Sequence, residues 1–566
     1  MRVTRRHFVQ SIAAAPAVMA PRPLLAALPA APALPAKLRP AIAAIAAYAE
    51  HHRRTIGVPG LTVGLIAPGL TGHSLRLGHT DTTDARAVGR DTLFQVGSIS
   101  KLMTATLAHQ LAAEGRLSLD GEVRAMLPGA AWPDGPKITL QQLLDHVSGL
   151  PGDAPLFPGE KLWLGFTPGG HWLYSNTGYG LLGLIIERAE QAPLATVLHR
   201  RLFAPLGMTR SRGAILSADR LAYAQGYEPA QREALYMPGD PLAPASWTDV
   251  TFGAGSVAST ADDMTRLMRS ILGAATGHGG LGLSPALASA FAGHSVDTAG
   301  GDAHGVIGAM RYGNGLMHVT DAAKRPYLHH TGGMPSFTSS FHIDAASGVG
   351  AFASVPLGYP ANYRPRLLTM FAAQALTAAA DGRELPQPPS LAIPKADGKD
   401  YVGSYSGARG KLVFADGPAG FTIASADGRG GKMLVLGADL FSARHPAFAA
   451  LPIMFARKDK KVVAVQYGGD TYVRDGAAFD VAKSDPALAR LGGRFENDSA
   501  WNLVAIVVER GGKLYLNGSD EMVRIADNLY RVGETWSPTR VRLADFVDGR
   551  PQSLFIDGDK LERRDL

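Results

Sequence analysis

The residues with the clearest chemical potential are a serine and a lysine three positions apart, Ser98 and Lys101. They follow a strand-like stretch and a glycine, Phe94 to Gly97, and open a segment with helical periodicity. A spacing of three places both side chains on one helix face, with Cβ atoms about 5 to 6 Å apart. A serine hydroxyl is a weak nucleophile until a neighbour takes its proton, and a lysine can do so when burial lowers its pKa. The pair therefore predicts Ser98 as a nucleophile and Lys101 as its base. Such a pair is also the ordinary pattern of an N-cap serine and a solvated lysine, so the interpretation depends on what accompanies it.

Two further motifs carry suitable groups. Tyr174-Ser175-Asn176 lies in a loop before a predicted helix, where a tyrosine hydroxyl can pass a proton and an asparagine amide can orient a lysine or hold a substrate carbonyl. His330-Thr331-Gly332-Gly333 is flanked by strand-like residues, and its glycines permit close approach of a substrate to backbone N–H donors. Each motif alone is also compatible with a purely structural role, a core tyrosine beside a turn asparagine or a polar turn between strands.

Two rival patterns occur in the same sequence. Tyr312-Gly313-Asn314 repeats the tyrosine–asparagine spacing, which shows how easily it arises by chance. Asp145, His146 and Ser148 suggest a serine–histidine–aspartate triad. Adjacent aspartate and histidine side chains point to different faces of a regular element and cannot easily relay to one serine. We therefore interpret the segment around His146 as structural.

Taken together and in this order, SxxK, YxN and HxG resemble the penicillin-recognising serine hydrolases, a family of β-lactamases, penicillin-binding proteins, D-aminopeptidases and related esterases. Ser98, Tyr174 and His330 are separated by 76 and then 156 residues, which is similar to the class C β-lactamase branch. Other segments are also similar, namely 114–120 (EGRLSLD), 138–151 (ITLQQLLDHVSGLP) and 255–263 (GSVASTADD). The resemblance covers roughly residues 41–380.

The resemblance implies a role for each matching residue. Ser98 would attack a carbonyl to give an acyl-enzyme that water hydrolyses, while Lys101 and Tyr174 handle the proton. The backbone N–H groups of Ser98 and Gly333 would form the oxyanion hole. The implied substrate-binding residues are Asn176, His330, Thr331, Gly332 and Gly333. The family needs no cofactor, and the scattered histidines lack the spacing of a metal site.

The third motif departs from that of true β-lactamases and most penicillin-binding proteins, where it begins with lysine. A permanent ammonium anchors a substrate carboxylate, and the neutral imidazole of His330 does so less strongly. The histidine form resembles D-aminopeptidases and some esterases of the family. We therefore predict cleavage of a small amide or peptide bond, by analogy next to a D-residue. Ester hydrolysis and β-lactam hydrolysis are the alternatives within the family, and a non-catalytic protein that binds peptidoglycan fragments or β-lactams is the alternative from another class.

The elements around these motifs predict an α+β fold. Strand-like segments at 61–66 and 92–96 precede helical periodicity at 99–114, 140–144 and 180–189. Further helices are expected at 41–53, 261–272 and 366–380, which gives an antiparallel sheet flanked by helices. The resemblance adds a β-lactamase-like catalytic domain with an all-helical subdomain.

The sequence pattern changes after the catalytic domain, from helical periodicity to short strand-like segments. A proline-rich linker at 384–398 separates the catalytic domain, 37–383, from short alternating apolar segments between glycine turns. Residues 401–405 (YVGSY) match 491–495 (LGGRF), and 438–441 (ADLF) match 527–530 (DNLY). Offsets of 90 and 89 residues predict two similar all-β domains, at 399–485 and 486–566, which resemble the pair that follows the catalytic domain in D-aminopeptidase.

Composition restricts the remaining classes. The 566 residues are 46% hydrophobic and 19% charged, as expected for packed domains, and the absence of cysteine excludes disulfides and thiolate chemistry. Four arginines of the first 36 residues contribute to the net charge of +7, so the remainder carries too little charge for a nucleic-acid partner. Thr4-Arg5-Arg6-His7-Phe8-Val9 resembles a twin-arginine export signal, so residues 1–36 predict export, for example to the periplasm. No later stretch approaches the roughly 20 apolar residues of a membrane span. The expected partner is a small-molecule or short-peptide substrate, and the oligomeric state is left open.

Overall fold

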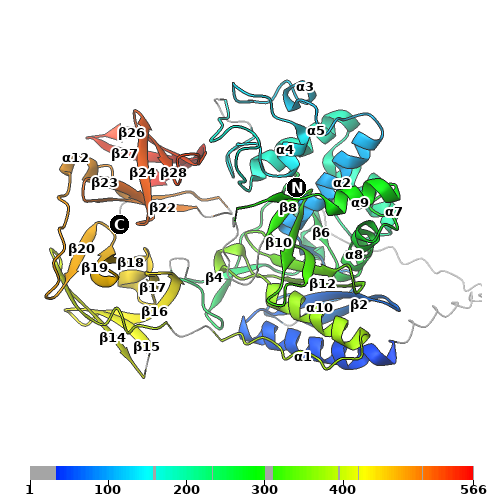
Figure 1. Cartoon of the computed structure of the whole chain (residues 1–566), viewed down its shortest axis with the longest axis horizontal. Coiled ribbons are helices and arrows are strands. Elements are labelled where there is room, and N and C mark those ends of the chain that lie inside the picture. The colour runs from blue at the N-terminus through cyan, green and yellow to red at the C-terminus, as the bar shows by residue number, and fades with distance from the viewer. Residues whose placement is uncertain are drawn as a thin grey trace, which may run out of the picture.

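The computed structural model comprises an α+β domain followed by two β-barrels (Figure 1). It describes residues 34–83, 85–156, 161–231, 234–299, 310–392, 396–418, 420–499, 501 and 503–564. The predicted twin-arginine segment lies outside the described residues. Among the described helices, none is both long and apolar enough to cross a bilayer.

An eight-stranded antiparallel sheet forms the centre of the first domain, in the order β2-β1-β12-β11-β10-β9-β8-β7. Its strands are β1 Gly60–Ala67, β2 Leu70–Gly78, β7 Val296–Asp297, β8 Arg311–Gly313, β9 Leu316–Thr320, β10 Pro326–Gly333, β11 Thr338–Asp344 and β12 Val349–Val355. β1 pairs with β12, so strands from the two ends of the domain lie side by side near the β2 edge of the sheet. β10, which carries the third motif, lies inside the sheet between β11 and β9.

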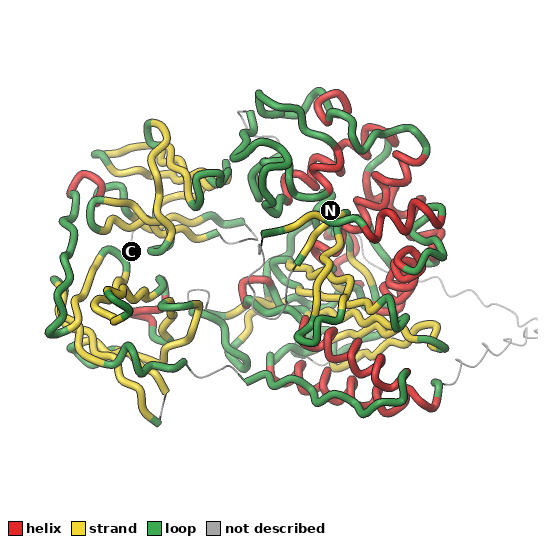
Figure 2. Tube along the Cα trace, viewed as in Figure 1, coloured by secondary structure: helices red, strands yellow, loops and turns green. Residues whose placement is uncertain are grey.

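Helices cover both faces of this sheet (Figure 2). α1 (Arg39–Thr55) and α10 (Arg366–Ala380) pack together and share one apolar cluster with β1 and β12. α8 (Ala261–Ala275) packs on β1, β2 and β12. Because they are covered on both faces, β1, β11 and β12 are buried along their whole length.

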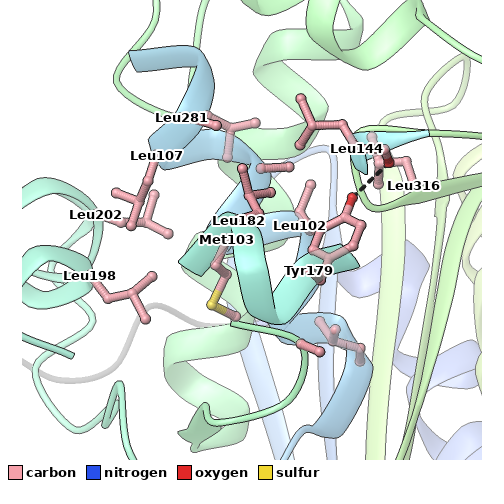
Figure 3. Packing of buried hydrophobic residues seen from close by; sticks show 14 of the residues in the cluster. Leu102, Met103, Leu107, Leu144, Tyr179, Leu182, Leu198, Leu202, Leu281 and Leu316 are labelled. Atoms are coloured by element: carbon pink, nitrogen blue, oxygen red, sulfur yellow. Dashed lines mark hydrogen bonds between the residues drawn. The ribbon is translucent and has the colours of Figure 1, made fainter. Parts of the chain in front are cut away.

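A second cluster forms the helical subdomain that carries Ser98 and Tyr174. Its longer helices are α2 (Ser100–Ala113) and α5 (Asn176–Glu190), which pack against each other. Figure 3 shows their apolar contacts and the bond from the Tyr179 hydroxyl to the Leu144 carbonyl, 2.9 Å long. α2 is buried on nearly every side, so its backbone is held rigidly.

Shorter elements connect these parts. The short helices are η1 Ala36–Leu38, η2 Gly97–Ile99, α3 Val123–Met126, α4 Leu140–Leu144, α6 Leu194–Leu198, η3 His199–Phe203, α7 Ala204–Leu206, η4 Ser217–Ala222, α9 Pro285–Gly293 and η5 Tyr359–Ala361. Two small antiparallel pairs join β3 (Phe94–Gln95) to β6 (Ala258–Ser259) and β4 (Tyr227–Pro229) to β5 (Leu242–Pro244).

The structure confirms the predicted α+β domain with two all-β domains, and it differs at two local points. The predicted strand at 92–96 is reduced to β3, which pairs with β6 outside the main sheet because the chain turns at Gly97. The predicted helix at 180–189 begins four residues earlier, at Asn176. Ser175 caps it, since its Oγ accepts a hydrogen bond from the Gly178 amide at 3.0 Å.

Each C-terminal domain is a closed barrel of eight antiparallel strands joined in chain order. The first contains β13 Gly403–Gly407, β14 Gly410–Gly417, β15 Gly420–Ser425, β16 Gly430–Gly437, β17 Leu440–Ala443, β18 Ile453–Lys458, β19 Lys461–Tyr467 and β20 Asp470–Arg474, with α11 Pro446–Ala449. The second contains β21 Gly493–Glu496, β22 Val504–Arg510, β23 Lys513–Leu516, β24 Asp520–Ala526, β25 Leu529–Val532, β26 Arg540–Val547, β27 Arg550–Ile556 and β28 Asp559–Arg563, preceded by α12 Pro486–Ala489.

The two pairs of matching sequence segments lie at equivalent strands of the two barrels. The first pair leads into β13 and β21, the opening strand of each barrel, and the second leads into β17 and β25, the fifth strand of each. The barrel interiors differ: the first is filled mainly by aromatic rings and the second mainly by aliphatic side chains. The repeat is therefore a repeat of topology around two different cores.

The barrels contact the catalytic domain through different groups. In the second barrel, Trp536 stacks on His171 with ring centroids 4.5 Å apart, and Trp163 Nε1 donates to the Pro538 carbonyl at 2.6 Å. In the first, Arg444 forms a bidentate ion pair with Asp240 at 2.7 and 2.9 Å. The ring stack and the hydrogen bond hold the second barrel beside the catalytic domain.

Candidate active site

Ser98 is delivered to the site by a turn that requires glycine. Gly97 has a φ of +53°, and a Cβ at this position would lie 2.8 Å from the amide nitrogen of Gly333. A Cβ on Gly332 would lie 1.9 Å from the Val96 carbonyl oxygen. The absence of side chains at these positions lets η2 lie directly against the end of β10. The first and third motifs therefore meet, as the resemblance to the penicillin-recognising serine hydrolases implied.

Lys101 is completely buried and points at the serine. Its Nζ lies 3.0 Å from Ser98 Oγ, 2.6 Å from Asn176 Oδ1 and 3.0 Å from the carbonyl oxygen of Ala254. Burial lowers the pKa of Lys101 to about 7, against an opposing effect of the Asp153 carboxylate. Near neutral pH, a substantial fraction of the lysine is therefore a neutral amine that can accept the proton of Ser98.

Tyr174 contacts the same two residues. Its hydroxyl hydrogen-bonds to Ser98, and Lys101 Nζ lies 4.6 Å from the centre of its ring. Burial raises the pKa of Tyr174 well above its ordinary value, so the phenol keeps its proton at neutral pH. The tyrosine is therefore a proton donor in the resting site, and the lysine is the better base.

Asn176 bridges the lysine and the cavity. Its Oδ1 accepts from Lys101, while its Nδ2 donates to Asp153 Oδ1 at 2.6 Å. Ser175 is the N-cap and Asn176 the first residue of α5, so the start of the helix sets the position of the Asn176 side-chain amide. Asp153 was not expected from the sequence, although it follows the 138–151 segment by two residues.

The β10 motif forms the facing wall. His330 is 1% exposed, and its Nε2 lies 3.3 Å from the Tyr312 hydroxyl while its Nδ1 lies 2.6 Å from the Thr331 carbonyl oxygen. Burial and the nearby charge of Lys101 lower the pKa of His330 to about 3, so its imidazole is neutral. Thr331 and Gly333 also line the cavity, whereas Gly332 is covered by the Val96 backbone.

A cavity of about 1300 Å³ opens in front of these residues. The catalytic domain contributes Ser98, Tyr174 and Asn176, and the second barrel contributes Trp501, Asp557 and Asp559 among others. The linker lines it with 390–392. The contribution of the second barrel to this wall could not be predicted from the sequence, because the position of the barrel depends on the contacts around Trp536.

The rival patterns do not form a second catalytic group. Asp145 Oδ2 pairs with His294 Nε2 at 2.8 Å, and Ser148 Oγ lies in its own turn, where it accepts from the Leu150 amide at 3.4 Å. His146 Nδ1 accepts a hydrogen bond from the Ser175 amide at 3.0 Å. These three side chains therefore have separate partners and form no triad.

Tyr312 of the rival tyrosine–asparagine pattern is buried against His330, while Asn314 Oδ1 contacts His109 Nε2 at 3.0 Å. Tyr312 is thus close to the site without lining its cavity. Across the described part of the chain, no three acidic, histidine or cysteine side chains are grouped to hold a metal ion.

The fold and the serine–lysine–tyrosine cluster together define a serine hydrolase of the penicillin-recognising class. The Beta-lactamase family model matches residues 45–373, more than half of the chain, and the chain belongs to this family. The matched range contains all three motifs and ends before the barrels.

The chain is similar both to penicillin-binding proteins and to β-lactamases. Penicillin-binding protein 4 of Amycolatopsis lactamdurans is 34% identical over 178 residues, 29% of this chain and 45% of that protein. A Beta-lactamase of Lysobacter lactamgenus is 30% identical over 235 residues, 40% of this chain and 57% of that protein. The chain thus spans about half the length of the curated relatives it matches.

One solved structure supports the fold over a larger part of the chain. The octameric penicillin-binding protein homologue from Pyrococcus abyssi aligns with a TM-score of 0.53 and 19% identity, covering 76% of this chain and 100% of that one. At this identity the similarity concerns the fold.

Proposed function

We propose that this protein hydrolyses small amide or peptide substrates through an acyl-enzyme on Ser98. The observation that carries the proposal is the buried Lys101, whose Nζ lies 3.0 Å from Ser98 Oγ and whose pKa is lowered to about 7. A lysine in this state is able to take a proton and has the nucleophile within hydrogen-bond distance.

Proton transfer can pass from Ser98 through Lys101 and Tyr174 and return to Ser98 at the end of the reaction. Neutral Lys101 accepts the Ser98 proton while Oγ attacks the substrate carbonyl to form a tetrahedral intermediate. As the C–N bond breaks, the Tyr174 hydroxyl gives its proton to the departing amine and regains one from the lysine ammonium. An acyl-enzyme and a free amine result. Water then attacks the acyl ester and gives a proton to Lys101 or Tyr174. The Ser98 oxygen receives a proton from these residues as the acid is released.

The negative oxygen of each intermediate needs donors. The close approach of Gly97 to the Gly333 amide nitrogen brings the backbones of η2 and β10 together at the serine. We assign the Ser98 and Gly333 N–H groups to the oxyanion hole on this basis. Replacing Gly97 with a residue that has a Cβ would push the two segments apart.

The cavity favours a substrate with a positive group rather than a β-lactam carboxylate. His330 is neutral, so it offers no permanent cation of the kind a third-motif lysine supplies. The carboxyl groups of Asp153, Asp557 and Asp559 line the cavity, together with Arg364 and Arg366. Burial, and to a smaller extent the negative charges of Asp153 and Asp559, raises the pKa of Asp557 to about 7. An ammonium beside the scissile amide would relieve this repulsion, as in an aminopeptidase acting next to a D-residue.

Turnover of four chromogenic substrates tests the proposal. D-alanine nitroanilide is compared with its N-acetylated form, a nitrophenyl ester and a chromogenic cephalosporin, each with wild type and Ser98→Ala. We expect the free-amine anilide to be preferred over the acetylated form, and Ser98→Ala to be inactive. Reaction of the ester alone would overturn the peptidase proposal in favour of an esterase, preference for the cephalosporin would indicate a β-lactamase, and absence of turnover would indicate a binding protein.

We also propose that the chain is exported through the twin-arginine pathway, on the basis of Arg5 and Arg6 in their sequence context. Cell fractionation of the full chain and of a variant with Arg5→Lys and Arg6→Lys tests this. Retention of the variant in the cytoplasm supports the proposal, and equal export of both contradicts it.

A further inference from the structure

His146 lies behind the active site, outside the three motifs. It follows α4, and the segment that contains Tyr174 precedes α5, a neighbouring helix (Figure 1). The His146 ring is 1% exposed and lies among aromatic side chains, with ring centroids 4.3 Å from Tyr174, 5.0 Å from Tyr179 and 4.6 Å from Tyr312. Its closest aromatic neighbour is therefore the proposed proton donor.

Two hydrogen bonds join His146 to the backbone on either side of Tyr174. The His146 carbonyl accepts from the Leu173 amide at 2.9 Å, and its Nδ1 accepts from the Ser175 amide at 3.0 Å. A single residue thus binds the backbone N–H groups of both residues that flank the tyrosine. It also fixes the entry into α5, whose first residue is Asn176.

The second bond determines the state of the imidazole. A backbone amide can only donate, so Nδ1 must carry no proton and Nε2 must carry one. Among the described residues, Nε2 has no hydrogen-bond partner, so the ring has no acceptor with which to relay that proton. Burial, and to a smaller extent the charge of Lys101, lowers the pKa of His146 well below its ordinary value, which keeps Nδ1 available as an acceptor. His146 is therefore unsuited to act as a base and well suited to hold a backbone.

The backbone at this position also bears strain. His146 has a φ of +60°, a left-handed conformation that side chains with a Cβ rarely adopt. Asparagine tolerates this conformation, and its Oδ1 occupies the position of the histidine Nδ1 relative to Cβ. Leucine has the same branching as asparagine at Cγ and lacks an acceptor. The two residues form a matched pair for testing the bond.

We propose that His146 is the positioning residue of the Tyr174 to Asn176 segment, which it holds from both sides so that the phenol and the amide converge on Lys101 and Ser98. The inference rests on the proposed acyl-enzyme reaction, because His146 acts through groups that take part in it. Its loss should slow attack by Ser98 while leaving the serine and lysine in place.

Labelling of Ser98 by a fluorophosphonate probe measures this attack whatever the natural substrate is. Rates are determined for wild type, His146→Asn and His146→Leu, with thermal unfolding used to correct for the folded fraction. We expect His146→Asn to remain within about threefold of wild type and His146→Leu to fall about 30- to 100-fold, as small displacements of catalytic groups do. Should the leucine variant fail to fold, His146→Gly, which accepts the left-handed backbone and lacks the acceptor, takes its place.

His342→Leu is the matched control for loss of a buried histidine. His342 is also 1% exposed, and its Nδ1 contacts Thr369 Oγ1 at 2.9 Å, away from the cavity. Its labelling rate should stay within about threefold of wild type, as expected for a site without a shared partner.

A Tyr174→Phe background distinguishes positioning from general packing. If His146 acts through the tyrosine hydroxyl, the cost of His146→Leu should shrink at least about fivefold when that hydroxyl is already absent. Equal labelling of His146→Leu and His146→Asn, equal slowing by His342→Leu, or undiminished cost in the Tyr174→Phe background would each show that His146 is a packing residue. If wild type itself is not labelled at Ser98, the proposed function fails and this inference fails with it.

Discussion

The two sides of the cavity are built in different ways. On the catalytic side, Ser98, Lys101 and Tyr174 are held by a buried helix and by short hydrogen bonds within one domain. On the opposite side, Asp557 and Asp559 sit on a hairpin of the second barrel, which reaches the cavity by docking through Trp536. The catalytic groups are thus positioned within one domain, whereas the proposed choice of substrate depends on contacts between domains.

The catalytic side is tested most severely at Lys101. Lys101→Met keeps an apolar stem in the buried site and removes the base, so kcat/KM should fall about 10³- to 10⁵-fold on every substrate. The melting temperature should not fall greatly, because the burial of an amine no longer opposes folding. Steady-state kinetics and thermal unfolding measure both effects. Activity within tenfold of wild type would exclude Lys101 as the base.

Tyr174→Phe should affect amides more than activated esters. An amine must be protonated as it leaves, whereas a nitrophenolate leaves without a proton. We expect a loss of about 10² to 10⁴ on the nitroanilide and of about tenfold on the nitrophenyl ester. Equal losses on both substrates would show that the tyrosine orients the serine and does not protonate the leaving group.

Substitutions on the barrel side of the cavity should change KM, and only for substrates that carry a positive charge. Asp559→Asn removes one negative charge from the cavity, and we expect KM for the free-amine anilide to rise about three- to tenfold, with the N-acetylated anilide unchanged. Asp470→Asn is the matched control, because Asp470 opens the last strand of the first barrel as Asp559 opens that of the second. A similar effect of Asp470→Asn, or an equal effect on the acetylated substrate, would contradict a role of the second barrel in selecting the amine.

The two sides meet electrostatically at Asp153, whose carboxylate raises the pKa of Lys101 against the larger effect of burial. Protonated Lys101 cannot accept a proton, so kcat/KM should rise with pH through an apparent pKa of about 7. Asp153→Asn keeps an oxygen for Asn176 and removes the charge, so this acidic limb should move to lower pH, by less than about one unit. The exposed Asp134, which pairs with Lys161, supplies the control variant Asp134→Asn. If the acidic limb of the Asp153→Asn profile stays in place or moves to higher pH, Asp153 does not raise the pKa of Lys101.

Much of the catalytic side could be predicted from the sequence. Ser98 and Lys101 are three residues apart, so a helix brings them together without further information. Tyr174 and His330 are distant in the chain, and their approach was predicted from motif order and from the resemblance to a known family. The structure shows these groups in one cluster and His330 on a strand, as expected.

The rest depended on packing that local patterns do not encode. The position of Asp557 follows from how a barrel docks, and the two barrels have the same topology although their docking contacts differ. His146 was recognised as structural, but its contact with the Ser175 amide depends on a left-handed turn and on the packing of α4 beside α5. The degree to which burial lowers the pKa of Lys101 likewise required the surrounding core.

The role of Ser98 as nucleophile is tested most directly by identifying the residue that reacts. Wild type and Ser98→Ala are treated with an active-site serine probe and analysed by intact mass and peptide mapping. We expect one adduct on Ser98 in wild type, none in Ser98→Ala and a much slower reaction in Lys101→Met. An adduct on another residue, or no adduct in the folded wild-type protein, would contradict this role.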